Sequence, residues 1–87
     1  MATRDSMDTL MQQVEDTIRY AEDQFKQSSL QEQYNDDGYT NALQQLEQTY
    51  QEICKMAHSA NSQQREQLHR MRLQIQQLQN SMIIETH

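Results

Sequence analysis

Apolar residues recur three and four positions apart in three separate stretches of this 87-residue chain. The spacing averages about 3.5 residues, which places the side chains of each stretch along one face of a helix. The three sets are Met7, Met11, Val14, Ile18, Ala21 and Phe25; Tyr39, Leu43, Leu46, Tyr50, Ile53, Ala57 and Ala60; and Leu68, Met71, Ile75, Leu78 and Met82. The pattern predicts an all-α protein in which these faces form the core.

A clear break separates the first two stretches. The segment 35–38 reads Asn-Asp-Asp-Gly and contains the only glycine of the chain, which has no proline. These residues tolerate turn conformations, because their side chains are absent or bond to nearby backbone. We expect a turn at 34–38, a first helix at about 6–31 and a second at about 39–59.

Capping residues precede the first and third stretches. Asp5 or Ser6 is expected to cap the first helix, because either side chain can accept a hydrogen bond from a free backbone amide. Asn61 is followed three residues later by Gln64, a spacing that resembles a capping box. This pair predicts a third helix at about 62–84 within the same single domain.

Two architectures remain open at Asn61, because neither glycine nor proline enforces a break there. The apolar spacing also continues past Asn61 with one extra four-residue step, a stutter that a continuous helix tolerates. Three helices of similar length suit an antiparallel three-helix bundle, which we favour. Alternatively, residues 39–84 form one helix of roughly 68 Å at 1.5 Å per residue. The chain would then be a helical hairpin whose 68–82 face requires a partner, most simply a second copy in a homodimer.

The net charge of −6 is unevenly distributed, since residues 1–38 hold nine acidic and three basic residues whereas residues 61–87 hold two and three. An acidic chain is poorly suited to nucleic acid or to an anionic membrane surface, both of which attract cations. The asymmetry predicts that the third helix packs against the first with partial charge complementarity. Arg65, Arg70 and Arg72 are expected to pair with acidic residues of the first helix (Glu15, Asp16, Glu22 or Asp23) or of a partner.

The chain carries no apolar stretch suited to a signal peptide or a membrane span. Its longest purely apolar run is 82–84, far below the length that crosses a bilayer. The single cysteine, Cys54, cannot form an internal disulfide. These features predict a protein of the cytoplasm.

Two pairs of residues have spacings seen in metal sites. Cys54 and His58 are four residues apart on one helix face, and Glu66 and His69 form a Glu-x-x-His motif of the kind found in di-iron bundles. A structural zinc site needs four ligands, and a di-iron site needs a second such motif. We therefore expect no metal and no cofactor, and metal binding by these four residues stands as an alternative.

No catalytic arrangement can be recognised, because the cysteine, histidines and serines follow no nucleophile motif and no glycine-rich loop is present. The chain is expected not to be an enzyme. Leu73, Ile83 and Ile84 lie off the third apolar stripe, so they are candidates for an exposed surface that binds an unknown protein partner or a second copy. The leading hypothesis is a non-enzymatic interaction or regulatory module, and a structural homodimer is an alternative.

Residues 31–36 (QEQYND) and 63–73 (QQREQLHRMRL) resemble the YtzC-like family of small uncharacterised proteins of spore-forming Gram-positive bacteria. The resemblance extends over nearly the whole chain. It implies a cytosolic helical protein of unassigned role, and it implies no catalytic or binding residues.

Overall fold

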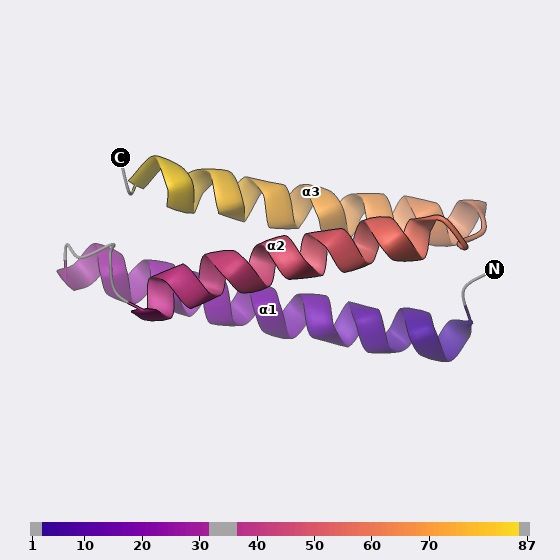
Figure 1. Ribbon diagram of the computed structural model, residues 1–87, viewed down its shortest axis with the longest axis horizontal. Coiled ribbons are helices and arrows are strands. Elements are labelled where there is room, and N and C mark those ends of the chain that lie inside the picture. The colour runs from indigo at the N-terminus through magenta and orange to yellow at the C-terminus, as the bar shows by residue number, and fades with distance from the viewer. Residues whose placement is uncertain (1–2, 32–36, 86–87) are drawn as a thin grey trace.

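The computed structural model describes residues 3–31 and 37–85, and within them it contains three α-helices and no strand. The helices are α1 (Arg4–Gln31), α2 (Asp37–Ala57) and α3 (Ser62–Glu85). They lie side by side with alternating direction in a bundle 44 Å long (Figure 1). The predicted antiparallel three-helix bundle is confirmed.

The start of α1 differs from the sequence prediction. Thr3 Oγ1 accepts a hydrogen bond of 3.0 Å from the backbone amide of Ser6, so Thr3 is the N-cap and the helix begins at Arg4. The prediction of Asp5 or Ser6 as the cap is wrong. Asp5 instead lies in the first turn, where its negative charge is favourable beside the free amides of the helix end.

The turn predicted at 34–38 ends earlier than expected, because α2 begins at Asp37 and not at about residue 39. Asp37 and Gly38 belong to α2, because an acidic residue is well placed in the first turn of a helix. The rest of the predicted turn, residues 34–36, lies outside the described residues.

A tight turn at 58–61 separates α2 from α3, so the alternative of one continuous helix over 39–84 is wrong. After α2 ends, the amide of Ser59 bonds the carbonyl of Met56 at 3.1 Å. The capping box is present: Asn61 Oδ1 accepts from the amide of Gln64 at 2.9 Å, and Gln64 Oε1 accepts from the amide of Asn61 at 3.0 Å. This reciprocal pair starts α3 without help from glycine or proline.

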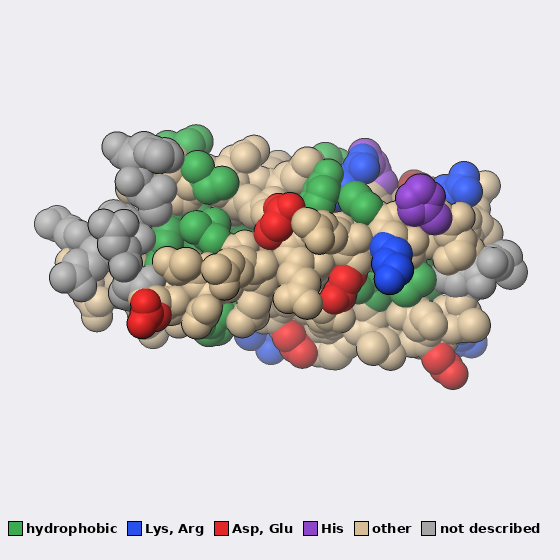
Figure 2. Space-filling view, in the orientation of Figure 1, with side chains coloured by type: hydrophobic (Ala, Val, Ile, Leu, Met, Phe, Trp, Pro, Cys, Tyr) green, Lys and Arg blue, Asp and Glu red, His purple; other side chains and the backbone are tan. Residues whose placement is uncertain are grey.

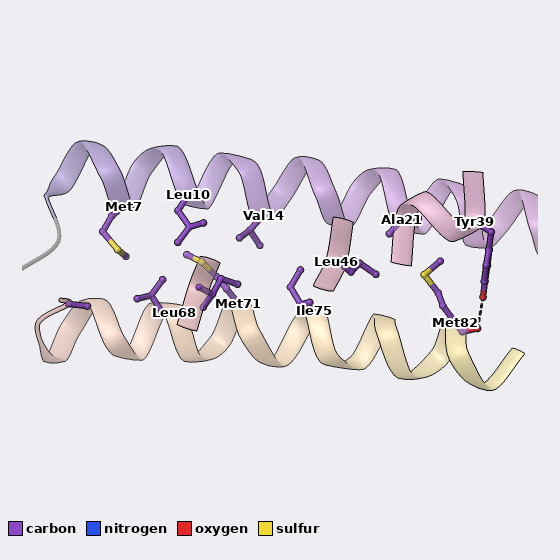
Figure 3. Close-up of a cluster of buried hydrophobic side chains, with 13 residues drawn as sticks. Met7, Leu10, Val14, Ala21, Tyr39, Leu46, Leu68, Met71, Ile75 and Met82 are labelled. Atoms are coloured by element: carbon purple, nitrogen blue, oxygen red, sulfur yellow. Dashed lines mark hydrogen bonds between the residues drawn. The ribbon is translucent and has the colours of Figure 1, made fainter. Parts of the chain in front are cut away.

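The core runs along the bundle axis, and Figure 3 shows side chains of α1 and α3 pointing toward one another across it. The buried apolar residues are Met7, Leu10, Val14, Ala21, Tyr39, Ala42, Leu46, Ile53, Ala60, Leu68, Met71, Ile75 and Met82. All but Leu10 and Ala42 belong to the apolar stripes found in the sequence.

The buried face of α1 is rotated slightly from the predicted stripe. Leu10 and Thr17 are buried, whereas Met11, Ile18 and Phe25 are only half-buried. Small polar side chains fit where α1 and α2 approach, and the larger apolar ones cover the margins. Thr17 and Thr49 of α2 place their hydroxyl oxygens 3.3 Å apart, so each hydroxyl has a hydrogen-bond partner in the core.

Polar side chains also join the helices around the core. The Tyr39 hydroxyl donates to the carbonyl of Met82 at 2.6 Å, which connects the start of α2 to the end of α3 (dashed in Figure 3). Gln13 Nε2 donates to Glu52 Oε2 at 2.6 Å, and Gln79 Nε2 donates to Glu47 Oε2 at 3.0 Å. Glutamines beside the apolar stripes therefore connect neighbouring helices.

Candidate functional site

Large apolar side chains remain exposed on α3. Leu73 and Ile83 are each 45% exposed and Ile84 is 71% exposed. Leu73 and Ile84 are eleven residues apart, which is close to three helical turns, so they lie on the same side of α3. That side is opposite the buried stripe, and Ile83 lies beside it. We call Leu73, Ile83 and Ile84 the outer apolar residues of α3.

The surroundings of the outer apolar residues are polar. Glu66 and Arg70 lie on the same side of α3 and form an ion pair of 3.1 Å, with both side chains largely exposed. Gln77 and Asn80 are exposed between Leu73 and Ile84. This surface is thus a small apolar area within a polar face.

One exposed apolar residue was not among the predicted partner-binding residues. Leu30 is 78% exposed near the C-terminal end of α1. Figure 1 shows that this end of α1 and the end of α3 lie at the same end of the bundle. The sequence alone could have predicted the exposure of Leu30, because this residue falls outside the spacing of the first apolar stripe.

A groove of about 280 Å³ lies between α2 and α3. We call it the α2–α3 groove. Its lining residues are Ile53, Cys54, Ala57, Arg65, Leu68, His69 and Arg72. Ile53 and Leu68 are buried, and Cys54 and Ala57 are half-buried. The groove therefore combines an apolar base with two arginines, a histidine and a thiol.

Hydrogen bonds hold the basic side chains of the α2–α3 groove in place. Arg65 Nε donates to the carbonyl of Ala57 at 3.3 Å, at the end of α2, where a positive charge is favourable. Arg72 Nη2 lies 2.9 Å from His69 Nδ1. A guanidinium group can only donate, so Nδ1 accepts in this contact.

The Nε of Arg72 is buried and has no hydrogen-bond partner among the described residues. Leaving a buried donor unpaired costs about 1–3 kcal/mol, and more for a charged group. This Nε has almost no contact with solvent, so it is a cost to the fold and not a donor that a ligand in the α2–α3 groove could reach.

The four candidate metal ligands are not brought together. Cys54 and His69 line the α2–α3 groove, whereas His58 is exposed in the turn after α2 and Glu66 pairs with Arg70. Over residues 3–31 and 37–85, no three His, Cys, Asp or Glu side chains lie close enough to hold a metal ion.

The predicted pairing of Arg65, Arg70 and Arg72 with acidic residues of the first helix is not found among the described residues. Arg70 pairs with Glu66 of its own helix, and Arg65 and Arg72 line the groove between α2 and α3. Most of the blue and purple side chains visible in Figure 2 gather over the end of the bundle where α2 turns into α3. Three of the seven Lys and Arg residues lie along α1, and the other four lie near the end of α2 or in the first half of α3.

A larger depression of about 650 Å³ lies between the start of α1 and the end of α2. Its charged lining residues are Asp5, Glu52 and Lys55, and Gln13 bonds to Glu52 within it. Mixed charges give this depression no preference for one sign of ligand.

None of the helices within the described residues is long and apolar enough to cross a membrane.

Comparison with known proteins agrees with the resemblance in the sequence. A family model described as "Protein of unknown function (DUF2524)" matches residues 1–84. The chain is 52% identical over 85 residues to "Uncharacterized protein YtzC" of Bacillus subtilis (strain 168), which covers 98% of this chain and 94% of that protein. No solved structure matches the chain. The chain therefore belongs to the DUF2524 family and is similar to YtzC over nearly its whole length, as segments 31–36 and 63–73 predicted.

Proposed function

We propose that this protein is a non-enzymatic interaction module of the cytoplasm that docks another protein on α3. The observation that carries the proposal is the exposure of the outer apolar residues Leu73, Ile83 and Ile84, on a helix whose opposite side is already packed in the core. Burying a Leu or Ile side chain fully stabilises a complex by about 1.5–3 kcal/mol.

The arrangement around these residues suits a docking surface. Interfaces that form and dissociate combine a small apolar centre with a polar rim. Leu73 and Ile84 supply apolar contacts along one line, and the Glu66–Arg70 ion pair and Gln77 supply polar contacts around them. The free Cys54 is consistent with a reducing compartment such as the cytoplasm.

Two observations support a role without catalysis. A nucleophilic cysteine needs a base within hydrogen-bond reach, and within the described residues no hydrogen bond joins Cys54 to His69. His69 Nδ1 instead accepts from Arg72. The groove that contains both residues is therefore better suited to binding than to nucleophilic chemistry.

The proposal can be tested by site-specific crosslinking inside the cells that naturally produce the protein. A photo-reactive residue at position 73 should yield an adduct of one defined mass, because this position would lie within the docked surface. The matched control is position 15, where Glu15 is also exposed but lies on α1. The substitution Ile84→Gln should remove the adduct from position 73.

Three outcomes would contradict the proposal. Equal adducts from positions 73 and 15 would indicate random collisions. An adduct from position 73 that persists in the Ile84→Gln variant would show that the outer apolar residues do not form the docking surface. An adduct with the mass of two copies would show that α3 binds a second copy of this protein and not another protein.

A further inference from the structure

We propose that the α2–α3 groove binds a small organic anion, a carboxylate or phosphate group carried on a short apolar body. Two arginines and a histidine line the groove above a buried apolar base, and none of its lining residues in the described part of the chain is a carboxylate. This site is separate from the outer apolar residues of α3, so the inference does not depend on the proposed docking function.

The sign of the charge is the first reason. The protein carries a net charge of −6, yet the groove lining within the described residues has two positive groups and no negative one. Arg65 is held over the groove by its bond to the carbonyl of Ala57, and Arg72 by its bond to His69. Concave sites lined by one sign of charge concentrate ligands of the opposite sign.

The unused donors are the second reason. Among the described residues, Arg72 uses only its Nη2 in the bond to His69, and Arg65 uses only its Nε in the bond to Ala57. While His69 Nδ1 accepts from Arg72, the other ring nitrogen, Nε2, can donate. An oxyanion accepts several such bonds at once, and charge-assisted bonds to guanidinium groups are about twice as strong as neutral ones.

The shape of the groove limits the rest of the ligand. A volume of about 280 Å³ is roughly the space of nine water molecules at ~30 Å³ each. It lies just below the range of about 300–1,000 Å³ that is usual for small-molecule sites. Ile53 and Leu68, both buried at the base, favour an apolar body over a second charged group. A single ring or short chain with one anionic group fits these limits.

Cys54 provides a built-in reporter, because it is the only cysteine of the chain and lines the groove. Its thiolate attacks one sulfur of an aromatic disulfide, a new S–S bond forms, and the other half leaves as a coloured thiolate or thione while the buffer takes the thiol proton. The rate with 5,5′-dithiobis(2-nitrobenzoate), an anionic reagent, is compared with the rate for neutral 4,4′-dithiodipyridine.

The ratio of the two rates measures attraction of an aromatic anion to the groove. Replacing one cation near the thiol, as in Arg65→Gln or Arg72→Gln, should lower the anionic-to-neutral rate ratio roughly three- to tenfold. Arg70→Gln is the matched control, since it removes the same charge from α3 on the side away from the groove. The anionic-to-neutral rate ratio of the Arg70→Gln variant should stay within roughly twofold of the value for the unsubstituted protein. Circular dichroism verifies that each variant remains helical.

Direct binding is tested with benzoate and its neutral analogue benzyl alcohol. Benzoate should slow the reaction of Cys54 with 4,4′-dithiodipyridine to a plateau, and benzyl alcohol should not. Arg72→Gln should abolish the protection, Arg72→Lys should retain part of it, and Arg70→Gln should retain all of it. The proposal would be overturned if benzyl alcohol protected Cys54 as well as benzoate does. It would also be overturned if Arg70→Gln and Arg72→Gln lost the protection by benzoate to the same extent.

Discussion

Thr17 and Thr49 form a polar contact inside an otherwise apolar interface between α1 and α2. Their hydroxyl oxygens are 3.3 Å apart, and both side chains are buried. Replacing one partner leaves the other hydroxyl buried without its bond, whereas replacing both with valine preserves the shape and removes both polar groups. We expect Thr17→Val and Thr49→Val each to lower the free energy of unfolding by about 1 kcal/mol, and the double variant by less than the sum.

Urea denaturation of the three variants measures this coupling. Thr40→Val is the control, because Thr40 is exposed at the start of α2 and should change stability by less than about 0.5 kcal/mol. Strictly additive losses would show that the two hydroxyls do not stabilise each other.

Tyr39 connects the start of α2 to the end of α3 through its hydroxyl. The side chain is buried and donates to the carbonyl of Met82 at 2.6 Å. Tyr39→Phe keeps the ring, including its edge contact with Phe25, and leaves that carbonyl without the bond. The expected loss is about 1–2 kcal/mol, which lowers the melting temperature by roughly 4–8 °C per kcal/mol in a domain of this size.

The matched substitution is Tyr20→Phe. Tyr20 is half-buried, and its hydroxyl makes no hydrogen bond to the described residues. Thermal unfolding followed by circular dichroism should give a much smaller change for this variant. Similar shifts for both variants would mean that the bond to Met82 adds no stability.

The buried threonines also mark the limit of what the sequence predicts residue by residue. The apolar spacing correctly identified Val14, Leu46 and Ile75 as core residues. It missed Thr17 and Thr49, because a hydrophobic pattern gives no weight to a polar side chain that finds its partner only when two helices meet. The identity of that partner depends on packing and is absent from either helix alone.

At the scale of the elements, the start of α3 is the best predicted boundary. Asn61 and Gln64 satisfy each other's backbone amides, as their spacing indicated. The start of α1 was harder, because Thr3, Asp5 and Ser6 can all cap a helix and lie within four residues. Such overlapping local signals are resolved only by the geometry of the folded chain.

The capping box carries a direct prediction. Asn61→Ala removes the acceptor for the Gln64 amide and should destabilise the protein by about 1 kcal/mol, whereas Asn61→Ser retains a capping side chain and should lose much less. Gln63→Ala, at an exposed position in the same first turn, serves as the control. Urea denaturation measures all three, and an Asn61→Ala protein as stable as the control would show that α3 starts without the cap.

For the whole molecule, the exposed residues of α3 were easier to anticipate than the α2–α3 groove. Leu73 and Ile84 fall off the apolar spacing of one helix, so the sequence predicts their position directly. The groove joins Cys54 to Arg72 across the turn at 58–61, and its lining depends on how α3 folds back on α2. The spacing of apolar residues within one helix does not predict how two helices pack against each other, so the sequence does not predict the groove.

The closed bundle leads to a prediction about self-association. In a symmetric dimer through the outer side of α3, each copy would bury the outer apolar residues Leu73, Ile83 and Ile84, and these are already partly covered. At about 1.5–3 kcal/mol for each fully buried side chain, their contribution is similar to the cost of association, about 4–15 kcal/mol. Light scattering should therefore give a molar mass close to 10.4 kDa at low micromolar concentration, with dimers only at much higher concentration.

The double variant Leu73→Gln, Ile84→Gln should remove that residual association and keep the unfolding free energy within about 0.5 kcal/mol, because both side chains lie outside the core. A stable dimer at low micromolar concentration that the double variant dissociates would instead make a second copy the partner of α3.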